Sequence, residues 1–124
     1  MANEITIQAG LALTNGNLSS PKITFNDTPD QTVARVYEDV QAIGTTAGGE
    51  VLVVGSISTA GWAIFRNLDA TNIIKIGPET GGAILDFITI APGETAGPFK
   101  FATSTIRAIA LVAGCELWYR IYEA

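Results

Sequence analysis

Apolar and polar residues alternate along much of the chain with a period of two, the pattern of a β-strand with one buried face. The first run is the clearest, and it is followed directly by Asn15-Gly16, a pair suited to a type I′ hairpin turn. A partner strand over residues 22–25 comes after Pro21. The apolar face of the first run consists of Ile5, Ile7, Ala9, Leu11 and Leu13.

Further runs of this kind follow, separated by turns rich in glycine, proline, aspartate and asparagine. They cover residues 50–54, 62–68, 73–76, 83–90, 98–101, 104–112 and 115–122. Pro92-Gly93 predicts a type II turn between two of them. No repeat or linker divides the chain. We therefore predict one all-β domain over residues 1–124, an antiparallel β-sandwich or jelly roll of about eight strands.

The segment over residues 31–43 is ambiguous. Its apolar residues fall at helical spacing, with Asp30 as a candidate N-cap and Gly44 as a candidate stop. The same segment has three valines, a tyrosine and an isoleucine, which favour a strand. The local pattern leaves both structures open, and the all-β context favours the strand.

Charge narrows the classes of partner. Charged residues make up only 15% of the chain, against about a quarter in an ordinary soluble domain, which indicates that other molecules cover part of the surface. The net charge is -5 and the basic residues are scattered, so we expect no direct contact with nucleic acid. No secretory signal or membrane-spanning run is visible, so we expect a chain made in the cytoplasm and no membrane partner.

The residues that usually carry catalysis are missing. The chain has no histidine and one cysteine, Cys115, which lies in an apolar run and is expected to be a buried, inert thiol. Asp86 interrupts another apolar run, and its favoured interpretation is a solvent-facing residue or an ion pair across the sheet. Asp69 and Asn72 favour turn formation over calcium binding. We predict no enzyme activity, no catalytic residue, no metal site and no cofactor.

A cluster of aromatic and basic residues is the candidate binding site. In the last run, Trp118, Arg120 and Tyr122 share one strand face, while the residues between them are apolar and face the other way. Tryptophan, tyrosine and arginine concentrate binding energy in protein interfaces. Trp62 and Arg66 complete the predicted interface. The same aromatic residues would also suit sugar stacking, or simply packing on the neighbouring strand.

The segment from Gly61 to Ala124 resembles a class of small bacteriophage virion proteins. The matching motifs are Gly61-Trp62, residues 65–72 (FRNLDATN), Ile76-Gly77 and Pro92-Gly93-Glu94. The N-terminal half is similar more loosely, through Thr14-Asn15-Gly16, Asp30-Gln31-Thr32 and residues 40–44 (VQAIG). This resemblance implies a β-sandwich and a place in a virion, and it names no catalytic residues.

The leading hypothesis is therefore an auxiliary capsid (decoration or cement) protein of a bacteriophage, located in the virion and assembled in the host cytoplasm. Its expected partners are its own copies, in a trimer or another symmetric homo-oligomer, and the major capsid protein or other virion proteins. A tail, baseplate or head-fibre component is the alternative within the virion. A carbohydrate-binding module is the alternative from another class.

Overall fold

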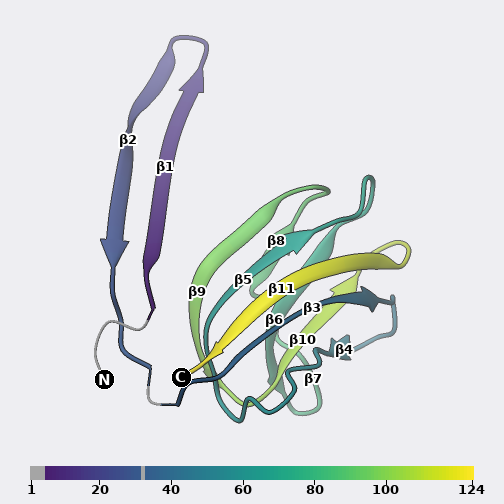
Figure 1. Ribbon diagram of the computed structural model, residues 1–124. Coiled ribbons are helices and arrows are strands. Elements are labelled where there is room, and N and C mark those ends of the chain that lie inside the picture. Colours follow the sequence, from purple (N-terminus) through teal and green to yellow (C-terminus); the bar gives the residue numbers. More distant parts are fainter. Residues whose placement is uncertain (1–4, 32) are drawn as a thin grey trace. The chain divides into compact units, whose positions relative to one another are not determined.

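The computed structural model describes residues 5–31 and 33–124, and all regular structure in them is β-strand (Figure 1). The predicted all-β antiparallel class is confirmed. Residues 1–4 and Thr32 lie outside the described residues. Thr32 belongs to Asp30-Gln31-Thr32, one of the motifs on which the resemblance rests. No helix capable of crossing a bilayer occurs in the described part of the chain.

Contacts divide the chain into an N-terminal unit, residues 1–32, and a body, residues 33–124. The N-terminal unit is built on a two-stranded hairpin, and a hairpin of this kind lacks the independent core that defines a domain. The division therefore does not decide between one domain and two, and a single domain over residues 1–124 stays a prediction.

The hairpin consists of β1 (Ile7–Asn15) and β2 (Leu18–Asp27). Asn15 still pairs with Leu18, so the turn residues are Gly16 and Asn17, one position later than expected, and Gly16 has a φ of 58°. The register shifts between Leu11 and Leu13, opposite the part of β2 that contains Pro21. Proline cannot donate a ladder hydrogen bond, so a break in the pairing accommodates it.

The first sheet of the body has four strands in the order β3-β11-β5-β9. These are β3 (Val36–Ile43), β11 (Cys115–Glu123), β5 (Ala60–Asn67) and β9 (Thr95–Thr103). Within the ambiguous segment, residues 36–43 form a strand, as the all-β context favoured, and no helix forms in its described residues. The strand pairs with β11 without interruption from Val36 opposite Tyr122 to Ile43 opposite Cys115, and this pairing overrides the helical spacing.

The second sheet runs β4-β10-β6-β7, and β8 also pairs with β6. Its strands are β4 (Glu50–Val51), β10 (Ile106–Ala110), β6 (Ile74–Thr80), β7 (Ala83–Ile84) and β8 (Ile88–Ile90). The continuous strand expected over residues 83–90 is interrupted between β7 and β8. There the backbone of Leu85 crosses Gly77 so closely that a Cβ on Gly77 would lie 1.8 Å from the Leu85 oxygen.

The core of the body lies between the two sheets. Phe65 and Phe101 meet edge to face within it, with ring centroids 6.0 Å apart. Leu117, Tyr119 and Ile121 of β11 are fully buried. The second sheet supplies Ile74, Ile76, Ile90, Ile106, Ala108 and Ala110. Alternating apolar residues of both sheets therefore fill one interior, as a sandwich requires.

Two buried polar side chains hold loops to the first sheet. The Tyr119 hydroxyl donates to the Val53 carbonyl at 2.5 Å, and burial raises its pKa. The carboxylate of Glu123 accepts backbone N–H groups of Ser58 and Thr59, at 3.1 and 2.7 Å, and the side chain of Arg35 at 3.2 Å. The two backbone hydrogen bonds are the main reason why the pKa of Glu123 falls to about 2.

Candidate interaction surface

The outward face of the sheet β3-β11-β5-β9 carries all the predicted interface residues. On β11, Trp118, Arg120 and Tyr122 are half-buried and alternate with the fully buried residues of the core. On β5, Trp62 and Arg66 occupy the corresponding outward positions, and Arg66 lies directly opposite Trp118. The five residues thus share one side of one sheet, which we call the outer face.

An acidic residue that sequence reasoning missed organises the centre of the outer face. Glu38 of β3 lies opposite Arg120, whose Nε donates to Oε1 of Glu38 at 2.6 Å. The indole N–H of Trp118 donates to the other carboxylate oxygen at 3.3 Å. The Arg120 guanidinium also lies 5.8 Å from the centre of the Trp118 ring. One carboxylate therefore orients both residues.

The charges of this cluster stabilise one another. The hydrogen bond from Arg120, followed by that from Trp118, lowers the pKa of Glu38, and the Glu38 carboxylate in turn raises the pKa of Arg120. Glu38 and Arg120 therefore both stay ionised at neutral pH. A partner would meet side chains already held in place, which reduces the entropy lost on binding.

The β5 side of the outer face is held more loosely. Arg66 is exposed and makes a long hydrogen bond of 3.4 Å to Thr95 of β9. Trp62 lies opposite Lys100, a second basic residue that the sequence did not single out. The indole nitrogen of Trp62 is the only buried side-chain polar atom without a hydrogen-bond partner among the residues described.

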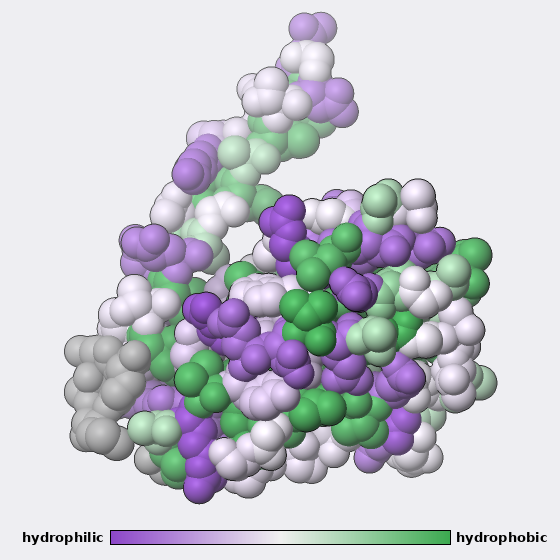
Figure 2. All heavy atoms as spheres, turned by 45° about the vertical axis from the view of Figure 1, so that its right-hand side comes forward, coloured by the Kyte–Doolittle hydropathy of each residue, from purple (hydrophilic) through white to green (hydrophobic). Residues whose placement is uncertain are grey.

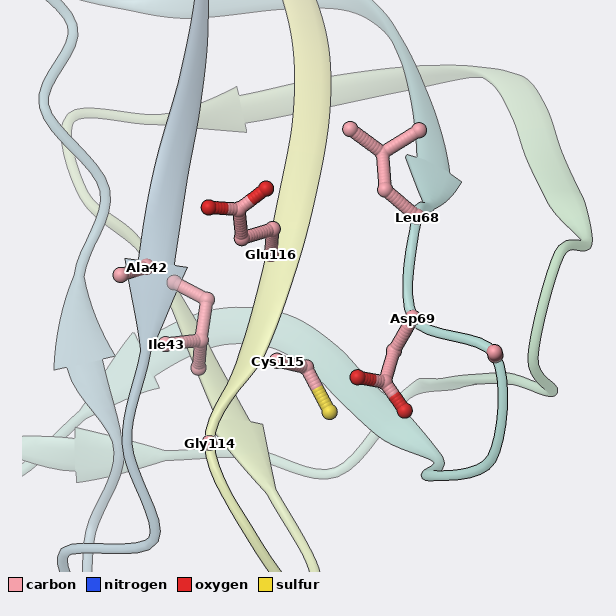
Figure 3. A pocket seen from close by; sticks show the side chains of 8 residues that line it. Ala42, Ile43, Leu68, Asp69, Gly114, Cys115 and Glu116 are labelled. Carbon is pink, nitrogen blue, oxygen red and sulfur yellow. The ribbon is translucent and has the colours of Figure 1, made fainter.

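A shallow groove of about 330 Å³ lies at the other end of β11, between the loop after β5 and the end of β3 (Figure 3). The Cys115 sulfur and the Asp69 carboxylate point toward one another there (Figure 3). Burial, with a smaller contribution from the Asp69 charge, raises the pKa of the thiol, which disfavours the reactive thiolate. The expected buried position of Cys115 is confirmed.

The Asp69 carboxylate is already used by the turn that contains it. One oxygen accepts the backbone N–H groups of Thr71 and Asn72, at 2.9 and 2.6 Å, and these bonds lower its pKa. Asn67 is fully buried and donates to the carbonyls of Asn72 and Ile90, at 2.8 and 3.1 Å. The NLDATN motif therefore forms the turn that Asp69 and Asn72 predicted, and the structure adds a hydrogen bond that ties it to β8.

The other acidic candidate is also explained by structure. Asp86 lies in the exposed segment between β7 and β8 and forms an ion pair with Lys75 at 3.3 Å, the interpretation that the sequence favoured. Across residues 5–31 and 33–124, no group of three or more acidic or cysteine side chains is arranged to hold a metal ion. A turn and an ion pair therefore account for the two acidic candidates, Asp69 and Asp86.

Comparison with known proteins adds no family: no family model, no curated protein and no solved structure matches this chain.

Proposed function

We propose that this protein is a non-catalytic structural component of a bacteriophage particle, an auxiliary capsid (decoration) protein that binds the capsid through its outer face. The observation that carries the proposal is the cluster of Glu38, Trp118 and Arg120, in which two residue types typical of interface hot spots are oriented in advance by a third. The resemblance to small virion proteins is the reason for placing this interface in a phage particle.

Two properties of the chain support a role in an assembly. Its low charge fraction matches a surface that neighbouring subunits partly cover. Its net charge of -5 would oppose contact with packaged nucleic acid and favours an outward position on the capsid. In this role the chain self-associates as a symmetric homo-oligomer and contacts the major capsid protein. A tail, baseplate or head-fibre position is the alternative within the particle.

The half-buried aromatic side chains of the outer face favour a second candidate, a carbohydrate-binding module. A sugar-stacking platform needs a free aromatic ring face, however, and Arg120 lies over the ring of Trp118 while Glu38 holds its N–H. This geometry supports the protein interface more strongly than the sugar site.

The deciding experiment is cryo-EM of particles from the phage that encodes this chain, compared with particles carrying Trp118→Ala/Arg120→Ala. We expect density for the chain on the capsid surface and its loss in the double variant. Phe87→Ala, which removes an exposed aromatic residue outside the outer face, is the matched control and should retain the density. Density confined to the tail would overturn the decoration role, and absence of the chain from purified particles would overturn the virion role.

The carbohydrate alternative has its own test. Retention of the purified protein on a panel of insoluble polysaccharides, lost in Trp118→Ala with folding intact, would favour the sugar-binding module. No retention of the wild type on any of them would argue against it.

A further inference from the structure

The hairpin β1–β2 presents one apolar face and one polar face. Ala9 pairs with Phe25, and Leu11 pairs with Ile23, and these four side chains with Gly10 line a shallow apolar hollow. Leu11 is 80% exposed, Ile23 55% and Phe25 68%. Figure 2 shows apolar residues, in green, along the hairpin. We call this side the hairpin face.

The opposite side of the hairpin is polar. Gln8, Lys22, Thr24 and Asn26 line it, and Gln8 pairs directly with Asn26. The Lys22 side chain lies over Gly10, where a Cβ would come within 3.1 Å of its Cε. The two sides therefore differ as the inside and outside of a folded sheet differ.

The size of the hairpin face indicates that it is covered when the protein functions. The register also places Leu13 and Leu18 on this side, and both are exposed. Together the five large apolar side chains leave on the order of 600 Å² uncovered, the upper end of what one patch on a monomer exposes. A lone two-stranded hairpin is only marginally stable in water.

Charge selects the kind of partner. Between Ile7 and Asp27 the only charged residues are Lys22, on the polar side, and Asp27, at the end of β2. Binding to an anionic membrane surface or to nucleic acid relies on clustered basic residues, which this segment lacks. The matching surface is therefore an uncharged, apolar face of a protein.

We propose that this surface is the hairpin face of a second copy of the chain. Two such faces brought together would bury on the order of 1,200 Å², the lower limit for a specific, stable protein interface. Identical faces meet about a two-fold axis, which places the same side chains on both sides of the contact. The product is a small two-layer sandwich of four strands, and a dimer is its smallest form. This pairing does not rest on the proposed role in a phage particle, and it should form in the purified protein.

The main test compares two double variants that each change one cross-strand pair. Leu11→Thr/Ile23→Thr removes apolar bulk from the hairpin face and places β-branched threonine, which favours strands, at both positions. Gln8→Thr/Asn26→Thr makes the same replacement on the polar side. Sedimentation equilibrium and native mass spectrometry should show a dimer whose Kd rises at least about tenfold in the first variant and stays unchanged in the second.

Hydrogen exchange keeps the test decisive if the first variant unfolds the hairpin. In the wild type, the amides of β1 and β2 should be protected at high protein concentration and lose that protection on dilution below the Kd, while β11 stays protected.

Several outcomes would overturn the proposal. A monomer with a protected hairpin at every concentration would mean that the chain covers its own hairpin. A monomer with an unprotected hairpin would mean that a different protein covers the hairpin face. An assembly with an odd number of subunits, or a dimer that survives Leu11→Thr/Ile23→Thr and dissociates with Trp118→Ala/Arg120→Ala, would also contradict it.

Discussion

The hairpin and the last strand of the body have the same sequence pattern and opposite surroundings. In β11, Leu117, Tyr119 and Ile121 alternate with outward residues and are fully buried under the second sheet. In the hairpin, Leu11 and Ile23 belong to an alternation that is equally regular, yet both remain more than half exposed. Period two identifies a strand with an apolar side, and the presence of a facing layer decides whether that side is core or interface.

This contrast gives the apolar residues of the two regions different consequences. Residues between the sheets stabilise the fold of the single chain. Residues of the hairpin face contribute to stability only through whatever covers them, so their effect should depend on protein concentration.

The largest expected difference is between two phenylalanines. Phe65→Ala removes a fully buried ring and should lower the free energy of unfolding of the body by about 3–5 kcal/mol. Phe25→Ala should change it by no more than about 0.5 kcal/mol in dilute protein. Urea unfolding followed by tryptophan fluorescence reports on the body, because Trp62 and Trp118 both lie there. Equal losses in the two variants would mean that hairpin and body unfold as one unit.

Two asparagines sharpen the contrast for polar groups. Asn67→Ala leaves the carbonyls of Asn72 and Ile90 and the N–H of Asp69 without their side-chain partner, and should cost about 2–3 kcal/mol. Asn26→Ala, on the exposed polar side of the hairpin, is the control and should be nearly neutral. Thermal unfolding of both variants measures the difference, and a neutral Asn67→Ala would contradict the role of the turn.

Two strand glycines provide a smaller test. Gly77→Ala would force the Leu85 backbone away from β6, and overpacking of this kind costs about 1–3 kcal/mol. The tight contact of Gly10→Ala is with the flexible end of Lys22, which can move aside, so its effect should be slight. Chemical denaturation of both proteins decides the point. Tolerance of Gly77→Ala would show that the segment between β7 and β8 is not fixed over β6.

The last comparison concerns pH. The pKa of Glu123 lies at about 2 in the folded body, below its ordinary 4.5, so the unfolded chain binds a proton more readily between these values. The stability that the carboxylate contributes is fully present above pH 4.5 and is lost as the pH falls toward 2. Glu123→Gln should flatten this part of the melting-temperature profile. Glu116→Gln, at an exposed position of the same strand, should keep the wild-type profile.

Features that depend on neighbouring residues could be predicted from the sequence. Pro92-Gly93 does form the expected turn, with a φ of 74° at Gly93 and a hydrogen bond of 3.0 Å from the Glu94 N–H to the Ala91 carbonyl. The face shared by Trp118, Arg120 and Tyr122 follows from alternation alone. So does the apolar side of the first strand.

Features that depend on distant pairing could not be predicted. Glu38 orients Arg120 from 82 positions away, because the order of strands places β3 beside β11. The interruption of residues 83–90 depends on the approach of Leu85 to Gly77, which no local pattern reveals. The exposure of the hairpin face likewise does not follow from its alternation, because β11 shows the same alternation with buried apolar residues.

The pairing of the first and last strands of the body also determines how the body would respond to mechanical load. Val36 lies opposite Tyr122, and the Glu123 N–H donates to the Arg35 carbonyl at 3.0 Å, so the two ends of the body are neighbours. Pulling residue 33 and Ala124 apart would separate β3 from β11 one residue pair at a time, beginning at this end. The first interactions to break would be those between Arg35 and Glu123, namely this backbone hydrogen bond and the ion pair at 3.2 Å. In a dimer held together by its hairpins, tension applied at the C-terminus would therefore act first on this pair of residues.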